Sequence, residues 1–172
     1  LLVDPVTVAA NVTAMAAHAR THGLTLRPHA KTHKTAEVAR AQLDAGATGL
    51  TVATVSEAEV FADAGCIDLF VAYPLWVDAA KGARLRALSA RASLLVGVDS
   101  TEGARALAAQ VPSTPVLVEL DSGQHRSGVP PQEAAALAEC AQRAGLEVRG
   151  VFTFPGHSYA PGAAAGVARE EA

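Results

Sequence analysis

The sequence predicts an α/β fold with a parallel sheet, arranged as a partial (β/α)8 TIM barrel with about six of the eight strands. Short runs rich in valine and leucine alternate with helical stretches along the chain. These runs mostly lack strict alternation of apolar and polar residues, which is typical of strands covered on both faces. Strict alternation of strands and helices indicates parallel strands joined by right-handed crossovers.

The expected strands follow a helix, in several cases directly after a glycine that ends it, because a left-handed residue often follows a helix. The helix-ending glycines are Gly23, Gly46, Gly65 and Gly145. The expected strands are residues 24–27, 49–53, 67–72, 93–98, 115–120 and 146–154.

The helices fill the intervals between these runs. Asp4 is the expected N-cap of the first helix, with Pro5 at its first position. Thr35 and Ser56 are the expected caps of the next two helices, and Ser56 to Glu59 has the form of a capping box. Later helices are expected over residues 78–90, 101–110 and 131–144.

Such a sheet can be open and doubly wound, or it can form a barrel. No Gly-x-Gly-x-x-Gly pattern follows an expected strand, which removes the main support for a dinucleotide-binding fold. Polar residues instead gather just after strand ends, where a barrel places its active site. These residues are Lys31, Tyr73, Asp99, 121–126 and 157–159. The barrel is therefore the favoured arrangement.

Composition limits the partners. A net charge of -3 gives no reason to expect nucleic acid or an anionic membrane surface, and no apolar run is long enough to span a bilayer. Cys66 and Cys140 are isolated in sequence, so buried, reduced thiols and a cytoplasmic location are expected. The chain begins with leucine and ends in a small, polar stretch over residues 160–172, so we expect it to be truncated at both ends.

The densest motif is Arg-Pro-His-Ala-Lys-Thr-His-Lys at residues 27–34, after the first expected strand. A lysine that forms a Schiff base reacts as the neutral amine, which burial and neighbouring cations favour. Positive potential around Lys31 is expected from Arg27, His29, His33 and Lys34. A basic surface loop that binds phosphate is an alternative interpretation. A zinc site on His29 and His33 is another, but no third ligand stands nearby in the sequence.

Two further loops follow strands. Residues 118–128 end a strand in an acid and continue into a loop with Arg126 between two glycines; glycine permits close backbone approach, and arginine keeps its charge. Residues 154–159 place His157 and Tyr159 beside a glycine, which suits contacts to an aromatic ring and a phosphate. An ordinary solvated loop and an ordinary turn are the alternatives. Tyr73 and Trp76 are interpreted as packing or rim residues.

Residues 27–34 resemble the cofactor-lysine segment of the D-threonine aldolase and D-serine dehydratase family, among the alanine racemase-like, fold-type III pyridoxal-phosphate (PLP) enzymes. Residues 119–129 and 156–159 resemble two further segments of that family, so the resemblance covers essentially the whole chain. It implies an eight-stranded barrel followed by a C-terminal β domain. Residues 1–172 would then be an incomplete PLP-binding barrel domain of the alanine racemase N-terminal type, without the β domain.

The resemblance also implies roles for individual residues. Lys31 would carry PLP as a Schiff base, and the other residues expected around the cofactor are His29, Arg126, His157 and Tyr159. Arg126 would contact the phenolic oxygen or the nitrogen of the ring. The racemases hold this arginine with a modified lysine, and Glu119 at the matching position could supply the anion directly. His157 would lie against the ring, and Tyr159 would reach the phosphate or the substrate.

The implied function is a PLP-dependent lyase for D-β-hydroxy amino acids. It would dehydrate D-serine to pyruvate and ammonia, or cleave D-threonine to glycine and acetaldehyde. The resemblance implies a divalent metal, zinc or manganese, with ligands outside this chain, and a homodimer. Residues 50–74 and the Gly-His-Ser-Tyr run at residues 156–159 look closer to the dehydratases. An amino-acid racemase is an alternative, although Thr32, His33 and Lys34 replace the Tyr-Gly-His-Gly-like run that follows the racemase lysine. A non-catalytic PLP-binding or homeostasis barrel is the other alternative function.

Overall fold

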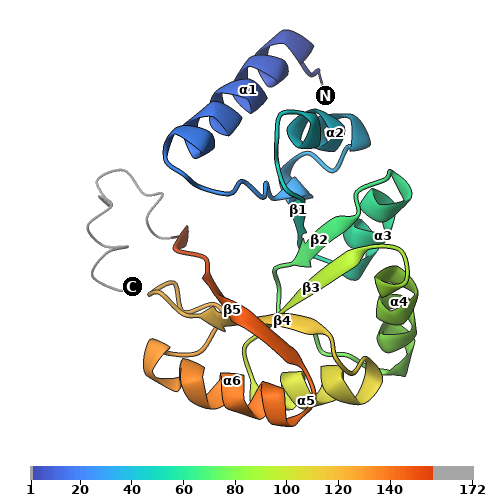
Figure 1. The fold of residues 1–172 in the computed structure, drawn as a ribbon, viewed down its shortest axis with the longest axis vertical. Helices are drawn as coiled ribbons and strands as arrows, with labels where there is room; N and C mark the ends of the chain where they lie inside the picture. Colours follow the sequence, from blue (N-terminus) through green and yellow to red (C-terminus); the bar gives the residue numbers. More distant parts are fainter. Residues whose placement is uncertain (1, 157–172) are drawn as a thin grey trace. The chain divides into compact units, whose positions relative to one another are not determined.

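The computed structural model describes residues 2–156 (Figure 1). The chain divides into two compact units. The first comprises Leu1–Ala72 and Ala87–Leu94, and the second Tyr73–Arg86 and Leu95–Ala172. The two units are described in turn.

From α2 onward, helices and strands alternate along the described residues, as predicted. The helices are α1 Pro5–Thr21, α2 Ala36–Asp44, α3 Val55–Asp63, α4 Ala79–Ser89, α5 Thr101–Gln110 and α6 Ala134–Arg143, with short 3-10 helices η1 Ala30–Thr32 and η2 Pro131–Glu133. The strands are β1 Leu50–Val52, β2 Asp68–Val71, β3 Ser93–Val98, β4 Pro115–Leu120 and β5 Glu147–Thr153. The pairs β1–β2, β3–β4 and β4–β5 are parallel, which confirms the α/β class and agrees with a partial barrel.

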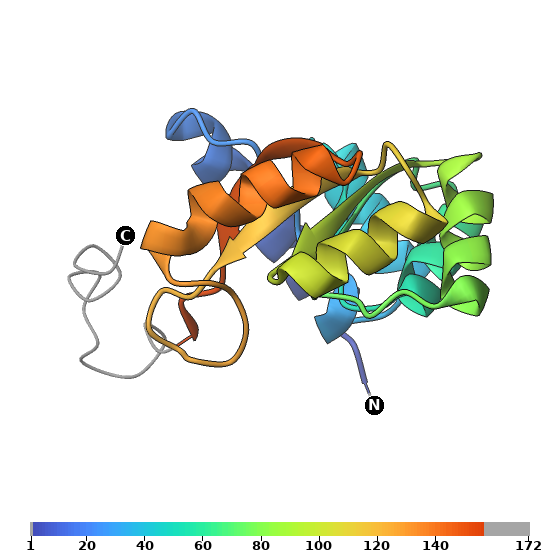
Figure 2. The same cartoon turned by 90° about the horizontal axis from the view of Figure 1, so that it is seen from below.

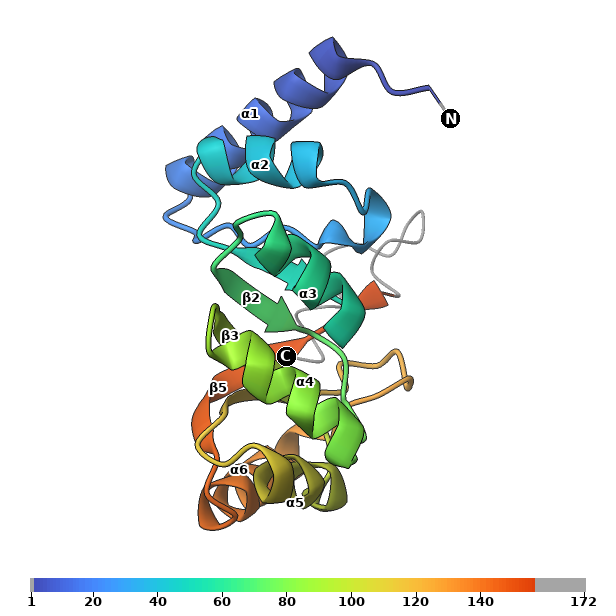
Figure 3. The same ribbon diagram turned by 90° about the vertical axis from the view of Figure 1, so that its right-hand side faces the viewer.

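In the first unit, β1 and β2 form a parallel pair with Leu50 opposite Leu69. Both leucines are fully buried, and Phe61 of α3 is 2% exposed. Helix α3 packs along this pair, while α1 and α2 lie against each other (Figure 3). Burial of these apolar side chains is the main stabilising contribution in this unit.

The first expected strand, residues 24–27, is not a regular strand, so five strands are present among the described residues and not six. This segment is extended, and its carbonyl groups accept hydrogen bonds from Thr48 and Thr51. Only His29 forms a bridge, opposite Thr51. Pro28 has no N–H to donate, which interrupts a regular ladder at this point.

Two expected helix starts differ in outcome. The Asp4 carboxylate accepts a hydrogen bond from the Val6 N–H at 3.0 Å, and Pro5 is the first residue of α1, so this cap is confirmed. Ser56 is not a cap: α3 begins one residue earlier, and the Thr54 hydroxyl accepts from the Glu57 N–H at 3.1 Å. The capping pair is therefore Thr54 and Glu57, which also satisfies the Ser/Thr-x-x-Glu spacing.

In the second unit, β4 lies between β3 and β5, with Val96 opposite Val116 and Val118 opposite Val151. Helices α5 and α6 run side by side over one face of these strands (Figure 2). Strand β5 alternates between exposed and half-buried residues, unlike the burial on both faces that the sequence indicates for most of the strands. The polar loops of this unit follow the carboxyl ends of β3 and β4, as a barrel site requires.

Both cysteines are buried and free, as expected, and burial raises the pKa of the Cys66 thiol. Among residues 2–156, no helix has the length and apolar character needed to cross a membrane.

Candidate active site

Lys31 lies on the η1 turn of the first unit. The turn follows the extended segment directly, and its first residue, Ala30, is completely buried. The Lys31 N–H donates to Nδ1 of His29 at 3.3 Å. The backbone of the candidate cofactor lysine is thus held by a buried neighbour and by an imidazole, while Lys31 itself is solvent-exposed.

The two histidines of the motif have the same local geometry. Nδ1 of His29 accepts from the Lys31 N–H, and Nδ1 of His33 accepts from the Thr35 N–H at 3.2 Å. An imidazole that accepts at Nδ1 carries its proton on Nε2. Burial, together with the Lys31 charge, lowers the pKa of His29 to about 4, so His29 is a neutral Nε2–H donor at neutral pH. His33 Nε2 is buried without a hydrogen-bond partner among the described residues.

The expected group of cations around Lys31 is largely neutralised, which corrects the sequence argument. The Arg27 guanidinium forms two hydrogen bonds with Asp68, at 2.9 and 2.8 Å, at the start of β2. Lys34 Nζ lies 3.0 Å from a carboxylate oxygen of Glu57. Since His29 is also neutral, positive potential from these three residues is not what would activate Lys31.

The zinc alternative finds no support in the described residues. No group of three or more histidine, cysteine, aspartate or glutamate side chains gathers there in a way that could hold a metal ion. His29 and His33 also use their Nδ1 atoms for backbone hydrogen bonds.

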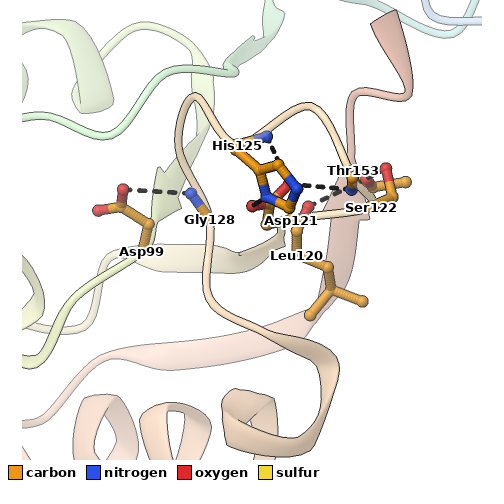
Figure 4. Close-up of polar contacts among 8 residues, drawn as sticks. Asp99, Leu120, Asp121, Ser122, His125, Gly128 and Thr153 are labelled. Carbon is orange, nitrogen blue, oxygen red and sulfur yellow. Dashed lines mark hydrogen bonds and ion pairs between the residues drawn. The ribbon is translucent and has the colours of Figure 1, made fainter. Parts of the chain in front are cut away.

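The second unit contributes the loop after β4, which Asp121 organises (Figure 4). One Asp121 oxygen accepts the N–H groups of Gly123 and His125, each at 3.0 Å, and the other lies 2.7 Å from His125 Nδ1. Hydrogen bonds from the backbone and ring of His125, and then from Gly123, hold the pKa of Asp121 below its usual range. Asp121 is therefore an ionised anchor for the loop.

The end of this loop, at Gly128, is also constrained. Gly128 has φ +97°, and a Cβ atom there would lie 2.6 Å from the Asp121 nitrogen. Its N–H donates to the Asp99 carboxylate at 3.4 Å (Figure 4). Ser122 and Thr153 add a hydroxyl contact of 2.6 Å between the loop and β5. Glycine is required at position 128 by both conformation and space.

This loop presents Arg126. Its guanidinium carbon lies 4.8 Å from the Phe154 ring centre and 5.9 Å from that of Tyr73. Arg126 also lines a cavity of about 300 Å³ together with Tyr73, Trp76 and Asp99. Tyr73 and Trp76, interpreted from the sequence as packing or rim residues, both line this cavity, and Tyr73 supports the arginine through a cation–π contact.

Glu119 is 2% exposed at the end of β4. Its Oε1 accepts from the Ser127 hydroxyl at 2.9 Å, and its Oε2 is buried without a hydrogen-bond partner among the described residues. Burial raises the pKa of this carboxyl, against the opposing effects of Ser127 and Arg126. Ser127 is thus the observed donor to Glu119, and the guanidinium of Arg126 instead lies against aromatic rings.

Some site residues were missed by sequence reasoning, and others cannot be placed. Glu57 could have been found from its position three residues after Thr54, but no sequence signal identifies Ser127 or Phe154 as neighbours of Glu119 and Arg126. His157 and Tyr159 lie outside the described residues.

These units define a barrel-type α/β fold whose polar loops follow parallel strands. The chain belongs to the alanine racemase N-terminal domain family, whose model matches residues 3–170. Membership of this fold-type III family implies PLP as cofactor.

Individual relatives cover different parts of the chain. It is 47% identical over 115 residues to an uncharacterized protein of Mycobacterium tuberculosis, a match that covers 64% of this chain and 67% of that protein. It is 37% identical over 159 residues to the D-threo-3-hydroxyaspartate dehydratase of a Delftia species, which covers 87% of this chain and 41% of the dehydratase.

A solved structure gives a similar result. The D-threonine aldolase of Filomicrobium marinum superposes with a TM-score of 0.82 at 35% identity, covering 87% of this chain and 42% of the aldolase. The chain therefore spans about two fifths of the length of the two enzymes compared here.

Proposed function

We propose that this chain is the cofactor-binding portion of a PLP-dependent lyase that acts on D-β-hydroxy amino acids, with Lys31 as the covalent anchor. The observation that carries the proposal is the exposed Lys31 on a turn held by the neutral imidazole of His29. The names of the Delftia dehydratase and the Filomicrobium aldolase support the same class of substrate.

The groups within each unit fit PLP chemically. The first unit offers a primary amine for the aldehyde of PLP, beside a neutral imidazole donor. The second offers the Arg126 guanidinium, supported by two aromatic rings, for the phenolic oxygen or nitrogen of the cofactor ring. His157 and Tyr159 complete the proposed set, against the ring and at the phosphate or substrate. PLP, when bound, supplies the electron sink for cleavage of a bond at the substrate α-carbon.

The protein's own groups have distinct tasks in this proposal. His29 offers an N–H donor at Nε2 without adding a charge beside the Lys31 amine, which must be neutral to react. Asp121 fixes the loop so that Arg126 is presented on Tyr73 and Phe154. Because guanidinium keeps its proton at all relevant pH values, Arg126 offers a fixed positive charge to the cofactor.

Two reactions are candidates. Dehydration of D-serine gives pyruvate and ammonia, and aldol cleavage of D-threonine gives glycine and acetaldehyde. We propose that a zinc or manganese ion holds the substrate hydroxyl as a Lewis acid, with ligands outside these 172 residues, and that the working enzyme is a homodimer.

Borohydride reduction of the PLP-loaded protein, followed by peptide mapping, tests the anchor. The label is expected on Lys31 and absent from the Lys31→Ala variant; a wild-type label only on Lys34 or Lys81 contradicts the proposal. Turnover of D-serine or D-threonine by the full-length protein, with added Mn²⁺ or Zn²⁺, tests the reaction. Labelling of Lys31 without turnover of either substrate favours a carrier, and interconversion of alanine enantiomers favours a racemase.

A further inference from the structure

Helix α1 ends with two histidines placed one turn apart. His18 is in the last turn and His22 is the C-cap, and both residues are exposed. Residues four positions apart lie on the same face of a helix. The two ring centres are accordingly only 4.2 Å apart, with an angle of 34° between the ring planes. Neither histidine is among the residues proposed to bind PLP, so the pair takes no part in that function.

The backbone fixes the position of the proton on one of these rings. Nδ1 of His22 lies 2.8 Å from the carbonyl oxygen of His18, which also accepts the backbone N–H of His22 at 3.2 Å. A carbonyl oxygen can only accept, so Nδ1 of His22 carries the hydrogen and the lone pair of the neutral ring is on Nε2. Histidines that bind metals usually donate their other ring N–H to a backbone carbonyl or a carboxylate in the same way.

The separation of the rings is close to that of two imidazoles that share a metal ion. Imidazoles bound at about 2.1 Å have ring centres about 4.6 Å apart when the angle between the bonds is about 90°, and about 5.3 Å apart at a tetrahedral angle. From the observed 4.2 Å, the angle of about 90° needs the smaller rotation of the exposed side chains. Square-planar and tetragonal sites have this angle, and they are typical of Cu²⁺ and Ni²⁺.

The electrostatic surroundings also favour a cation. The last carbonyl groups of a helix carry a partial negative charge, which stabilises a positive charge nearby. Arg20 lies between the two histidines in sequence, but residues two positions apart do not face each other on a helix. Its guanidinium donates to the Ala45 carbonyl at 3.1 Å, at the end of α2. Arg20 is therefore engaged on another face of α1.

We propose that His18 and His22 together bind a divalent transition metal ion of the Cu²⁺ and Ni²⁺ type. Each imidazole supplies one nitrogen, and water completes the coordination because both residues are exposed. Imidazole is a preferred ligand of these metals, whereas Mg²⁺ and Ca²⁺ prefer oxygen. A site with two protein ligands is consistent with the finding that residues 2–156 contain no metal-binding group of three or more. The inference does not depend on the proposed function.

Protection of the two histidines from diethylpyrocarbonate, with Ni²⁺ alone as the probe, tests the site. The reagent modifies imidazole nitrogens, and peptide mass spectrometry after tryptic cleavage at Arg20 reports His18 and His22 on separate peptides. We expect Ni²⁺ to protect both histidines with the same midpoint, and Mg²⁺ to protect neither. In His22→Ala, protection of His18 should require about tenfold more Ni²⁺ or higher, since losing even a residue that only orients a metal ligand costs about 10–100-fold in affinity.

Two matched variants separate chelation from the mere presence of two histidines. Combining Ala17→His with His18→Ala keeps two exposed histidines on α1, but at a spacing of five residues that places them on different faces. We expect this variant to bind Ni²⁺ as weakly as His22→Ala. Adding Ala14→His to His22→Ala restores the four-residue spacing at another exposed position, and protection of His18 should return.

Three results would overturn the proposal. Protection of His18 that is unchanged in His22→Ala, or protection of the relocated pair at the wild-type Ni²⁺ concentration, would mean that each imidazole binds alone. Absence of protection of either histidine in the wild-type protein would leave the pair with only its hydrogen bond at the end of α1. Circular dichroism of each variant establishes that a loss of protection does not come from unfolding of the helix.

Discussion

Removal of the Ser127 hydroxyl, in the loop after β4, should reveal how the buried Glu119 carboxylate is stabilised. In Ser127→Ala, Oε1 of Glu119 loses its 2.9 Å donor, and Oε2 already lacks a donor among the described residues. A hydrogen bond to a charged group contributes about 1.5–3 kcal/mol. We therefore expect the free energy of unfolding to fall by about 2 kcal/mol at pH 8, which for a chain of this size lowers Tm by about 4–8 °C.

The effect should depend on pH in a defined direction. Burial raises the pKa of Glu119, so the folded state binds a proton more tightly than the unfolded chain does. Stability from this group is therefore complete below the unfolded pKa and falls as the pH rises through the folded value. Because a neutral carboxyl group makes a weaker hydrogen bond, Ser127→Ala should cost only about 1 kcal/mol when Glu119 is protonated.

Urea unfolding followed by circular dichroism at pH 5 and pH 8 measures this difference. Ser127→Thr retains a hydroxyl and is the matched control. In the Glu119→Gln background, the cost of Ser127→Ala should be about 1 kcal/mol at both pH values, as expected for a neutral acceptor. An equal cost at pH 8 with and without Glu119→Gln would refute a charge-assisted bond.

Three further predictions address single residues within each of the two units. Gly128→Ala should destabilise the fold by about 1–3 kcal/mol, measured by urea unfolding, because φ is +97° and a Cβ would lie 2.6 Å from the Asp121 nitrogen. Asp68→Asn should cost no more than about 1 kcal/mol, since its pair with Arg27 is partly exposed, and should leave PLP labelling of Lys31 unchanged; loss of labelling would contradict our separation of this pair from the site. NMR titration should show His29 neutral above about pH 5, and its contribution to stability should be lost as the pH falls from 6.5 towards about 4, because the unfolded chain binds the proton more tightly; a midpoint near 6.5 would contradict the buried environment.

The sequence predicts the regular elements well where their local signals agree. Ser93–Val98, Thr101–Gln110 and Pro115–Leu120 have the predicted limits, because a continuous apolar run or a capped helix defines each end. The first strand fails because Pro28 interrupts its hydrogen bonds, although the segment remains extended. The local sequence pattern therefore predicts where the chain is extended more reliably than it predicts regular strand pairing.

The sequence does not predict the contacts of the site that form between residues far apart in the chain. Sequence spacing identifies a basic segment, but it does not reveal that Arg27 pairs with Asp68 and Lys34 with Glu57. Those partners are 41 and 23 positions away, with several other carboxylates in between. The neighbours of Lys31 in sequence therefore predict a positive charge around this residue. In the folded chain, carboxylates that are distant in sequence neutralise much of that charge.

The same pairing explains how two irregular loops keep their shape. Lys34 and His125 are non-glycine residues with φ +54° and +55°, and each contacts a carboxylate, Glu57 and Asp121 respectively. Asp121 also accepts the N–H groups of Gly123 and His125, so this one ionised group fixes both the path of its loop and the His125 side chain, whereas Glu57 accepts the Ala53 N–H outside the Lys34 turn. Since His125 directly precedes Arg126, its conformation sets the direction in which the guanidinium leaves the loop. Strained conformations supported in this way are typical of functional loops, and the two loops concerned are the ones that carry the proposed cofactor contacts.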